Sequence, residues 1–399
     1  MSRQGKLAFV PSRYGADVVG GAETVMREQA HGLAERGWEV EVLTTCARDH
    51  YTWANEYPAG VEQVGAVTVR RFPAVVSTPR TERAVLGDAI GRGMGAAMPL
   101  AAQQRWMNDD MRVPELFHFL LDNAGDYRAL VFGPYLFWTA FTCSQIAPGR
   151  SLLWACVHDE PEVRLEIFKP MFAGLAGLWF QADPEHELAH QVFDSLAPHR
   201  VVGCGIEVPK AYDPEGFRAR YGIPGRFLLY AGRREPAKGW DALLQGFSAA
   251  TRRHDLPFSL VTMGTGELRL PEELRSLVID VGFLPDDERD NAFAAADAAL
   301  QPSAHEAFSR TVMEAWLAGS LVIASAASAV VAWHCERSGA GLTYRDDVEL
   351  EQCLLFLADA PESASALAAR GREYVLRHYA FPDVLDRIEA GIEEWTAPR

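Results

Sequence analysis

Residues 297–319, DAALQPSAHEAFSRTVMEAWLAG, contain the succession of patterns that decides the fold. The apolar run 297–302 is typical of a buried strand. A polar loop follows it, and then an amphipathic helix that ends near Gly319, because glycine commonly terminates helices. A second apolar run, 321–324, comes directly afterwards. A strand, a helix and another strand in this order indicate a parallel sheet that is covered by helices.

The same alternation extends outward along the chain. Further strands are predicted at 6–11, 40–45, 226–231 and 257–263, with helices between them. The pattern restarts after Pro209, and 399 residues are too many for one typical domain. The sequence therefore predicts an α/β protein with two similar domains.

Composition and charge limit the functional classes. Hydrophobic residues make up 48% and charged residues 23%, as expected for a globular protein with a sizeable core. The net charge of −16 argues against a nucleic-acid partner, because such a partner requires basic surface. The six cysteines form no CxxC pair, the segment 1–13 lacks a signal peptide, and the uncharged stretch 129–149 is interrupted by Gly-Pro. We therefore expect reduced thiols and a cytoplasmic location.

Two acidic residues follow the strand at 297–302. Glu306 lies in the loop and Glu314 in the helix, beside the end of a strand where open α/β sheets bind ligands. If the span were helical, the two would lie roughly 12 Å apart along the axis, since each residue rises about 1.5 Å. This separation suits the ends of an elongated ligand better than the two sides of one glycosidic bond. Two solvated helix charges are the alternative.

The start of the same helix is a candidate phosphate site. Phe308 and Ser309 would present backbone amides there, and a helix N-terminus favours anions. An ordinary serine N-cap explains the pattern equally well.

A cationic loop, residues 232–239, follows the strand at 226–231. It reads GRREPAKG, in which Arg233, Arg234 and Lys238 supply two or three cations. Such groups at the end of a strand can neutralise a diphosphate, although a basic surface turn is the alternative. No Asp-x-Asp pair occurs in the chain, so we expect no metal site. The positive charge would then come from Arg233, Lys238 and helix ends.

Two further candidates lie in the N-terminal half. Gly20 and Gly21, between the first strand and the first helix, would let a ligand approach the backbone, unless they form a plain turn. His158 ends a short apolar strand, where a lone histidine is more often structural.

Together these motifs resemble those of the family 4 retaining glycosyltransferases, of the glycosyl transferases group 1 type, which have the GT-B fold. The resemblance covers nearly the whole chain. The residues that carry it are Gly20, Gly21, His158, Gly232, Arg233, Lys238, Gly239, Gly264, Gly266, Gly282, Phe283, Leu284, Glu306 and Glu314.

The resemblance implies two Rossmann-like domains that face each other across a deep cleft. We expect residues 1–205 to bind the acceptor and residues 206–375 to bind the nucleotide sugar. The C-terminal helix, 376–399, would return to the N-terminal domain.

It also implies a catalytic set. Arg233 and Lys238 would neutralise the donor diphosphate as it leaves. Glu306 would contact hydroxyls of the donor sugar, and His158 would hold that sugar near its reacting end.

The implied donor-binding set completes the site. Glu314 would bind the ribose hydroxyls, and the amides of Phe308 and Ser309 would complete this cradle. Backbone around Phe283 and Leu284 would contact the base.

The implied activity is metal-independent, retaining transfer of a hexose-type sugar from a nucleotide-diphosphate sugar to an acceptor hydroxyl, in glycan, polysaccharide or glycolipid biosynthesis. The donor, UDP- or GDP-linked, is a substrate, and no cofactor is expected. The leaving phosphate would deprotonate the acceptor. A nucleotide-sugar epimerase and a non-catalytic nucleotide-sugar-binding subunit on the same fold are the alternatives.

The acceptor side is less defined. Gly20 and Gly21 would approach the diphosphate or the acceptor. Residues 70–112 carry seven arginines against four acidic residues, a local net charge of +3. This favours a phosphorylated or lipid-linked glycan as acceptor and peripheral contact with a membrane, but a mixed helical surface explains the charges at least as well.

The chain departs from the family at three places. Ser309 stands where the commonest form has glycine, and residues 324–329 read ASAASA where the family often has Gly-Gly and Glu. Arg310 is also unusual beside the donor. These differences leave the donor sugar open.

Overall fold

The computed structural model describes residues 5–18, 20–77 and 81–396, which form two compact units. Unit 1 comprises Met1–Gly203 and Val384–Arg399, and unit 2 comprises Cys204–Asp383. The sequence placed the two divisions after residues 205 and 375, whereas the chain passes between the units at 203/204 and 383/384.

Unit 1 is built on an eight-stranded sheet with the order β10-β9-β8-β7-β1-β2-β4-β3. Neighbouring strands are parallel except β3 and β4. All five residues of β7 are buried, because strands of a covered parallel sheet face apolar side chains on both sides. The strands are β1 (Lys6–Pro11), β2 (Glu39–Thr45), β3 (Gly60–Val64), β4 (Val67–Phe72), β7 (Ala129–Gly133), β8 (Ser151–Trp154), β9 (Gly177–Phe180) and β10 (His199–Val201).

Eight α-helices, several short 3-10 or π turns and a short two-stranded sheet, β5 (Val75–Val76) with β6 (Met111–Arg112), complete the part of unit 1 that the structure describes. Within that part, as in the described part of unit 2, no helix has the length and apolar character needed to cross a membrane. The helices are α1 (Gly21–Glu35), α2 (Thr81–Ala89), α3 (Leu100–Asn108), α4 (Pro114–Asn123), α5 (Trp138–Cys143), α6 (Lys169–Gly174), α7 (Asp183–Val192) and α15 (Phe381–Trp395).

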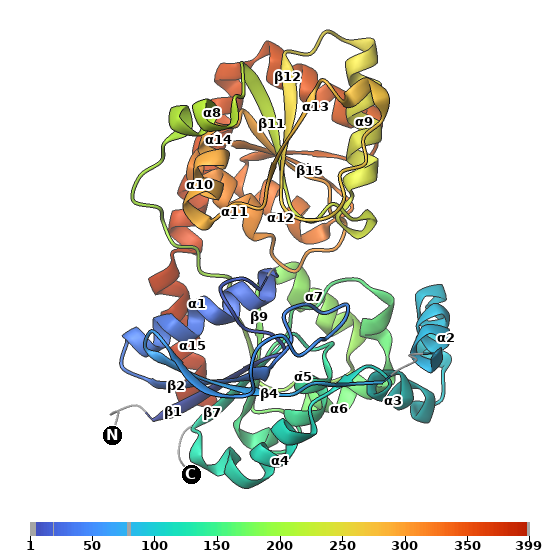
Figure 1. Ribbon diagram of the computed structural model, residues 1–399, viewed down its shortest axis with the longest axis vertical. Helices are drawn as coiled ribbons and strands as arrows, with labels where there is room; N and C mark the ends of the chain where they lie inside the picture. Colours follow the sequence, from blue (N-terminus) through green and yellow to red (C-terminus); the bar gives the residue numbers. More distant parts are fainter. Residues whose placement is uncertain (1–4, 19, 78–80, 397–399) are drawn as a thin grey trace. The chain divides into compact units, whose positions relative to one another are not determined.

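The C-terminal helix α15 packs against unit 1 beside α1 (Figure 1). The guanidinium of Arg36, just after α1, lies 2.5 Å from the carboxylate of Glu389. The ring of Trp395 covers Gly177 so closely that a Cβ there would lie 2.1 Å from the indole. Helix α15 therefore completes unit 1, whose strands all precede unit 2 in the sequence.

Unit 2 is built on a six-stranded parallel sheet with the order β13-β12-β11-β14-β15-β16. Six parallel strands require helical crossovers, which is what the alternating sequence pattern predicted. The α/β prediction is thus confirmed. The strands are β11 (Arg226–Ala231), β12 (Phe258–Met263), β13 (Val278–Gly282), β14 (Ala298–Gln301), β15 (Leu321–Ser325) and β16 (Gly341–Tyr344).

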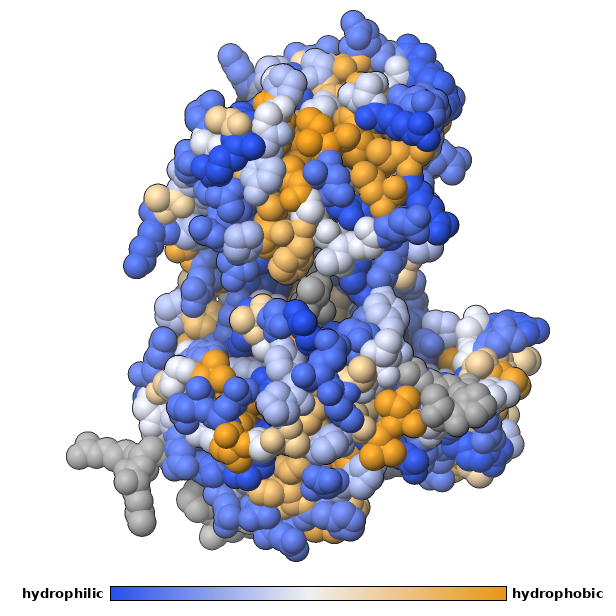
Figure 2. All heavy atoms as spheres, in the orientation of Figure 1, coloured by the Kyte–Doolittle hydropathy of each residue, from blue (hydrophilic) through white to orange (hydrophobic). Residues whose placement is uncertain are grey.

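The helices of unit 2 cover both faces of this sheet (Figure 1). Helix α9 packs with α13, and α11 packs with α10 and α14. The exposed faces in view are mostly hydrophilic, with apolar residues in patches (Figure 2), because the apolar side chains of the strands lie inside. The helices are α8 (Pro214–Tyr221), α9 (Trp240–Arg253), α10 (Asp286–Ala295), α11 (Arg310–Ala318), α12 (Ala329–Ser338), α13 (Asp347–Asp359) and α14 (Pro361–His378).

Candidate active site

The strand order of unit 2 reverses between β11 and β14. From β11 the chain continues to β12 and β13 on one side, and from β14 to β15 and β16 on the other. Ligands of open α/β sheets bind at such a switch point, beside the carboxyl ends of the strands. The loops that leave these two ends are the cationic loop (residues 232–239) and the acidic loop, residues 302–309, which contains Glu306. The sheet topology therefore brings the two strongest sequence candidates together.

Two glycines allow the backbone of the cationic loop to approach its neighbours closely, at the acidic loop and at the end of β12. Gly239 has φ of 72°, and a Cβ there would lie 2.4 Å from the carbonyl oxygen of Pro302 in the acidic loop. Gly264, at the end of β12, has φ of 133°, and a Cβ there would lie 2.1 Å from the carbonyl oxygen of Gly232. Side chains at either position would separate the strand ends, so these glycines are required by close approach.

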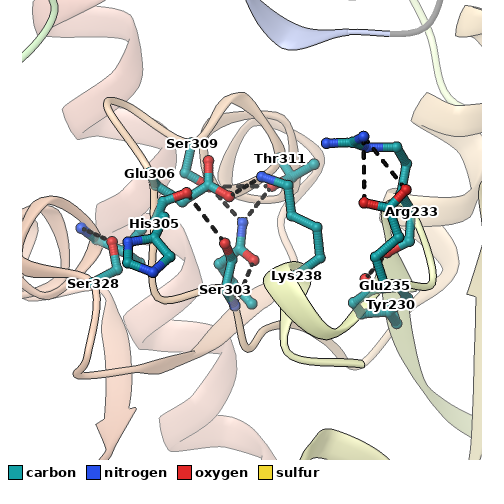
Figure 3. A network of polar contacts seen from close by, with 12 residues as sticks. Tyr230, Arg233, Glu235, Lys238, Ser303, His305, Glu306, Ser309, Thr311 and Ser328 are labelled. Atoms are coloured by element: carbon teal, nitrogen blue, oxygen red, sulfur yellow. Dashed lines mark hydrogen bonds and ion pairs between the residues drawn. The ribbon is translucent and has the colours of Figure 1, made fainter. Parts of the chain in front are cut away.

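Lys238 and Glu306 form the central ion pair of the site. The Lys238 Nζ lies 2.8 Å from Glu306 Oε1, and both side chains are only partly exposed. Arg233, on the same loop, pairs with Glu235 at 3.3 Å, and the Tyr230 hydroxyl donates to the Arg233 carbonyl at 2.6 Å. Figure 3 shows Lys238 reaching from the cationic loop towards Glu306, with Arg233 beside Glu235. Both cations predicted for a diphosphate therefore lie in one polar network.

Arg234, the third cation of this loop, has a structural role instead. Its guanidinium pairs with Asp280 of β13 and donates to the carbonyl oxygen of Gly266 at 2.7 Å. The residue is buried, so it joins the loop to neighbouring strand ends. The charge run in the sequence did not distinguish Arg234 from Arg233.

The acidic loop ends at Ser309, which caps α11 in a left-handed conformation with φ of 69°. Its hydroxyl accepts from the Gln301 amide at 2.6 Å. Phe308 is buried against the rings of His334 and Tyr379, with centroids 5.1 and 4.8 Å away. Both residues are nearly inaccessible, so their side chains anchor the loop and only backbone groups remain for a ligand.

Glu314 lies in the middle of α11 and is 8% exposed. Its Oε1 lies 3.3 Å from the guanidinium of Arg289 on α10 and 3.3 Å from that of Arg310, one turn earlier on α11. Two guanidinium partners hold this buried carboxylate in place. Arg310, the unusual residue of the sequence motif, is thus one of the groups that hold Glu314.

Phe283 follows β13 and is 60% exposed, although it is a large aromatic residue. Its neighbour Leu284 is buried, and Gly282 before it adopts φ of 73°. The positive φ turns the chain at the strand end, so the Phe283 ring is presented to solvent and can stack on a flat ligand.

In unit 1 the sheet order reverses between β1 and β7, and Gly20 follows β1. Gly20 precedes α1 in an extended conformation, and a Cβ there would lie 2.1 Å from the Glu23 carboxylate. That carboxylate forms a buried ion pair with Arg13. Among the described residues, and apart from its chain neighbours and its own helix backbone, no atom lies within 4 Å of a Cβ built on Gly21, the first residue of α1. A helix N-terminus favours anions.

His158 lies in the loop after β8, within unit 1. Its Nδ1 is 3.2 Å from the Glu160 carboxylate, which also accepts from the Tyr135 hydroxyl at 2.6 Å. Burial raises the pKa of Glu160 to about 7. The buried carboxylate of Glu185, on α7, accepts from the Val157 amide at 2.7 Å and so fixes the start of this loop.

The structure thus places the predicted residues in two groups. Arg233, Lys238, Phe283, Leu284, Glu306, Phe308, Ser309 and Glu314 lie in unit 2, and Gly20, Gly21 and His158 lie in unit 1. Sequence reasoning did not single out Tyr135, Glu160 and Glu185. Of these three, only Glu160 could have been found from the sequence, because it lies two residues from His158.

The basic stretch 70–112 carries less free charge than its sequence suggests. Most of its arginines pair with carboxylates, and Arg80 lies outside the described residues. The support that this stretch gave to an anionic acceptor is therefore weakened. The pairs are Arg70–Glu41, Arg71–Glu62, Arg83–Asp110, Arg92–Asp88 and Arg105–Glu82.

Residues 225–359 match the family Glycosyl transferases group 1. The D-inositol 3-phosphate glycosyltransferase of Saccharomonospora viridis is 26% identical over 386 residues, which cover 91% of this chain and 86% of that protein. The 2-deoxystreptamine glucosyltransferase of Streptomyces kanamyceticus is 31% identical over 142 residues, which cover 33% of this chain and 35% of that protein. These matches confirm the resemblance to group 1 glycosyl transferases, while assignment to family 4 stays a prediction.

Solved structures share the fold. The sucrose-phosphate synthase of Thermosynechococcus elongatus has a TM-score of 0.72 at 17% identity, with 98% of both chains covered. Anabaena HepE in complex with UDP-glucose has a TM-score of 0.69 at 17% identity, with 98% of this chain and 99% of that chain covered. The predicted GT-B fold is therefore confirmed.

Proposed function

Because this chain has the GT-B fold and matches the group 1 glycosyl transferases over residues 225–359, we propose that it transfers a hexose-type sugar from a nucleotide-diphosphate sugar to an acceptor hydroxyl. The reaction retains the anomeric configuration and uses no metal ion at the diphosphate. The observation that carries this proposal is the Lys238–Glu306 ion pair at the switch point of the unit 2 sheet, with Arg233 on the same loop.

The cationic loop supplies the charge that the diphosphate needs. Lys238 and Arg233 are each paired with a carboxylate in the structure. A bound pyrophosphate replaces these partners as an acceptor of hydrogen bonds, and Glu306 then becomes available to the sugar hydroxyls. The cations stabilise the leaving diphosphate as its negative charge grows, which is the main route by which fixed charges accelerate such a step.

The nucleoside end of the donor is held by two groups. Glu314 accepts hydrogen bonds from the ribose hydroxyls, and Arg289 and Arg310 keep its carboxylate in position. The exposed ring of Phe283 stacks on the base. The donor is UDP- or GDP-linked; HepE was crystallised with UDP-glucose, which supports the first.

The reaction proceeds by substitution on one face of the sugar. The leaving phosphate takes the proton of the acceptor hydroxyl, so the chain contributes positioning and charge stabilisation rather than a separate base. His158 holds the sugar, and its Nδ1 lies 3.2 Å from the Glu160 carboxylate. We assign this role to His158 from the family resemblance.

The acceptor carries free hydroxyl groups on a sugar or a cyclic polyol. Relatives are named for D-inositol 3-phosphate and for 2-deoxystreptamine, which supports a small cyclic acceptor. A phosphorylated or lipid-linked glycan remains within this class. We propose that the protein works in the cytoplasm, with or without peripheral membrane contact.

A thermal-shift panel of UDP-, GDP-, ADP- and dTDP-hexoses tests donor binding, because a ligand that binds the folded state raises the melting temperature. We expect a UDP- or GDP-sugar to give the largest rise. Transfer to inositol phosphate and aminocyclitol acceptors is then followed with and without added Mg²⁺ or Mn²⁺, and NMR of the product reports the anomeric configuration. Epimerised donor formed without acceptor, or binding with no turnover on any acceptor, would support one of the two alternatives instead.

A further inference from the structure

Three histidines meet at one edge of unit 1. His186 and His190 lie on α7, and His199 begins β10, the edge strand of the sheet. One potential ligand atom of each residue lies within 4.8 Å of those of the other two. The ring centroids are 4.5, 4.9 and 5.2 Å apart. None of the residues assigned to the donor or acceptor belongs to this cluster.

The two helical histidines have a spacing that suits a shared ligand. They are four residues apart, so they project from one face of α7. The pentapeptide 186–190, HELAH, has the H-E-x-x-H spacing of zinc-binding helices. The Nε2 atoms of His186 and His190 are 3.0 Å apart. Two nitrogens bound tetrahedrally to zinc at about 2.0–2.1 Å are separated by roughly 3.3 Å, so little movement is needed.

His199 supplies the third nitrogen in a defined tautomer. Its Nδ1 lies 2.8 Å from the carbonyl oxygen of Ala197. A carbonyl oxygen can only accept, so Nδ1 carries the proton and Nε2 keeps its lone pair. Metal-bound histidines commonly have this arrangement, in which a backbone carbonyl orients the ring through its other nitrogen.

Aromatic packing of the three rings explains the cluster less well than a shared ligand does. The His186 and His199 rings do pack against Phe180, at 5.3 and 6.1 Å between centroids. All three histidines are nevertheless at least partly exposed, so solvent and ions can reach them. Each of the three imidazoles can offer one ring nitrogen to a shared ion, because their possible ligand atoms all lie within 4.8 Å of one another.

We propose that His186, His190 and His199 bind one divalent transition-metal ion. Zn²⁺ fits best, because it accepts three imidazoles in a tetrahedral site and leaves the fourth position to water. The ion joins α7 to the edge strand β10. Since Glu185 on the same helix fixes the loop that carries His158, the ion stiffens this part of unit 1.

The test uses tag-free, full-length protein that has been treated with EDTA and dialysed, because a histidine tag would bind the same ions. Titration with ZnCl₂ in a calorimeter should show one equivalent bound. His190→Ala and His199→Ala should each weaken the affinity by more than about 100-fold. His118→Ala removes an exposed histidine on α4 and should leave zinc binding unchanged.

Two further measurements show whether each variant is folded and which atoms bind the ion. Far-UV circular dichroism verifies that each variant is folded, and Co²⁺ in place of zinc should give the visible spectrum of a tetrahedral nitrogen site without a thiolate band. The proposal is overturned if micromolar zinc does not bind the parent protein, if His190→Ala binds it as tightly, or if the Co²⁺ spectrum shows cysteine ligation. Donor binding does not enter these readouts, so they are independent of the proposed function.

Discussion

The ammonium of Lys238 and the carboxylate of Glu306, 68 residues apart in the chain, lie 2.8 Å from each other. Each lies in the loop that follows one of the two central strands of the unit 2 sheet, and each partly neutralises the charge of the other. A ligand that binds here has to offer an anion to Lys238 and hydroxyl groups to Glu306. A sugar joined to a diphosphate offers both.

Lys238→Ala should lower kcat/KM for the donor by about 10²–10³, the range found when one stabilising donor is removed from a reacting anion. The fold should be retained, because the side chain is 30% exposed. Steady-state kinetics measure the change, and Lys169→Ala, which removes a surface ion pair in unit 1, is the matched control. Unchanged kinetics in Lys238→Ala would remove the basis for the proposed diphosphate site.

Glu314→Ala should affect both binding and stability. Without the carboxylate, Arg289 and Arg310 lose a shared partner, so the free energy of unfolding should fall by about 3 kcal/mol, the lower end for broken buried pairs, because both guanidiniums are partly exposed. The KM for the donor should rise as well. Urea denaturation and kinetics separate the two effects. A stable variant with normal donor KM would contradict the assigned role.

Substitutions at Ser309 should separate backbone strain from side-chain bonding. Glycine removes a left-handed strain of about 1–3 kcal/mol but also loses the Gln301 hydrogen bond, worth about 1 kcal/mol. Ser309→Gly should therefore be as stable as the parent or slightly more stable. Ser309→Val loses the bond and is β-branched at positive φ, so it should be clearly less stable. Equal urea midpoints for the two variants would show that this φ is unimportant.

Phe283→Ala should weaken donor binding by roughly tenfold or more, since stacking of a base on an aromatic ring contributes about 1–3 kcal/mol. Stability should hardly change, because the ring is 60% exposed. Calorimetric titration with the preferred nucleotide measures the effect. Val348→Ala, another exposed apolar residue of unit 2, is the control. Equal affinity in both variants would place the base elsewhere.

Stability should depend on pH through Glu160. Burial raises its pKa from 4.5 to about 7, so the folded chain holds a proton there that the unfolded chain has lost between these values. The stabilising contribution is complete below pH 4.5 and is lost as the pH rises to about 7. Relative to Glu160→Gln, the free energy of unfolding of the parent protein should fall by about 3 kcal/mol across this pH range. Urea unfolding of both proteins at several pH values measures the difference, and parallel curves would contradict it.

Local sequence patterns predicted the fold and the centre of the donor site. Apolar runs alternate with segments of 3.6-residue periodicity, so strands alternate with helices along the chain. This alternation predicts a parallel sheet covered by helices. Lys238 and Glu306 were predicted because both follow strand ends, which lie on one edge of a parallel sheet. Their direct contact requires that β11 and β14 are neighbouring strands. The strand order of the whole sheet determines this, and local sequence patterns do not show it.

Other features depend on partners that are distant in the chain. Arg233 and Arg234 are adjacent and chemically equal in sequence, yet only Arg234 finds Asp280 and becomes buried. The HELAH segment carries the spacing of two ligand histidines but was not predicted as a site from the sequence. The third histidine comes from an edge strand whose neighbour is fixed by tertiary pairing. The positive φ of Ser309 is likewise set by the way the loop packs on the core. This packing overrides the preference of serine for negative φ.

The path of the chain into and out of unit 2 has a consequence for synthesis. Within unit 2 the entering and leaving segments are paired, with the Ile206 amide donating to the Tyr379 carbonyl at 2.9 Å. Unit 2 is thus an insertion with adjoining ends, and it can fold as soon as it has left the ribosome. Unit 1 is interrupted by unit 2, so its strands are made before unit 2 but its helix α15 becomes available only afterwards.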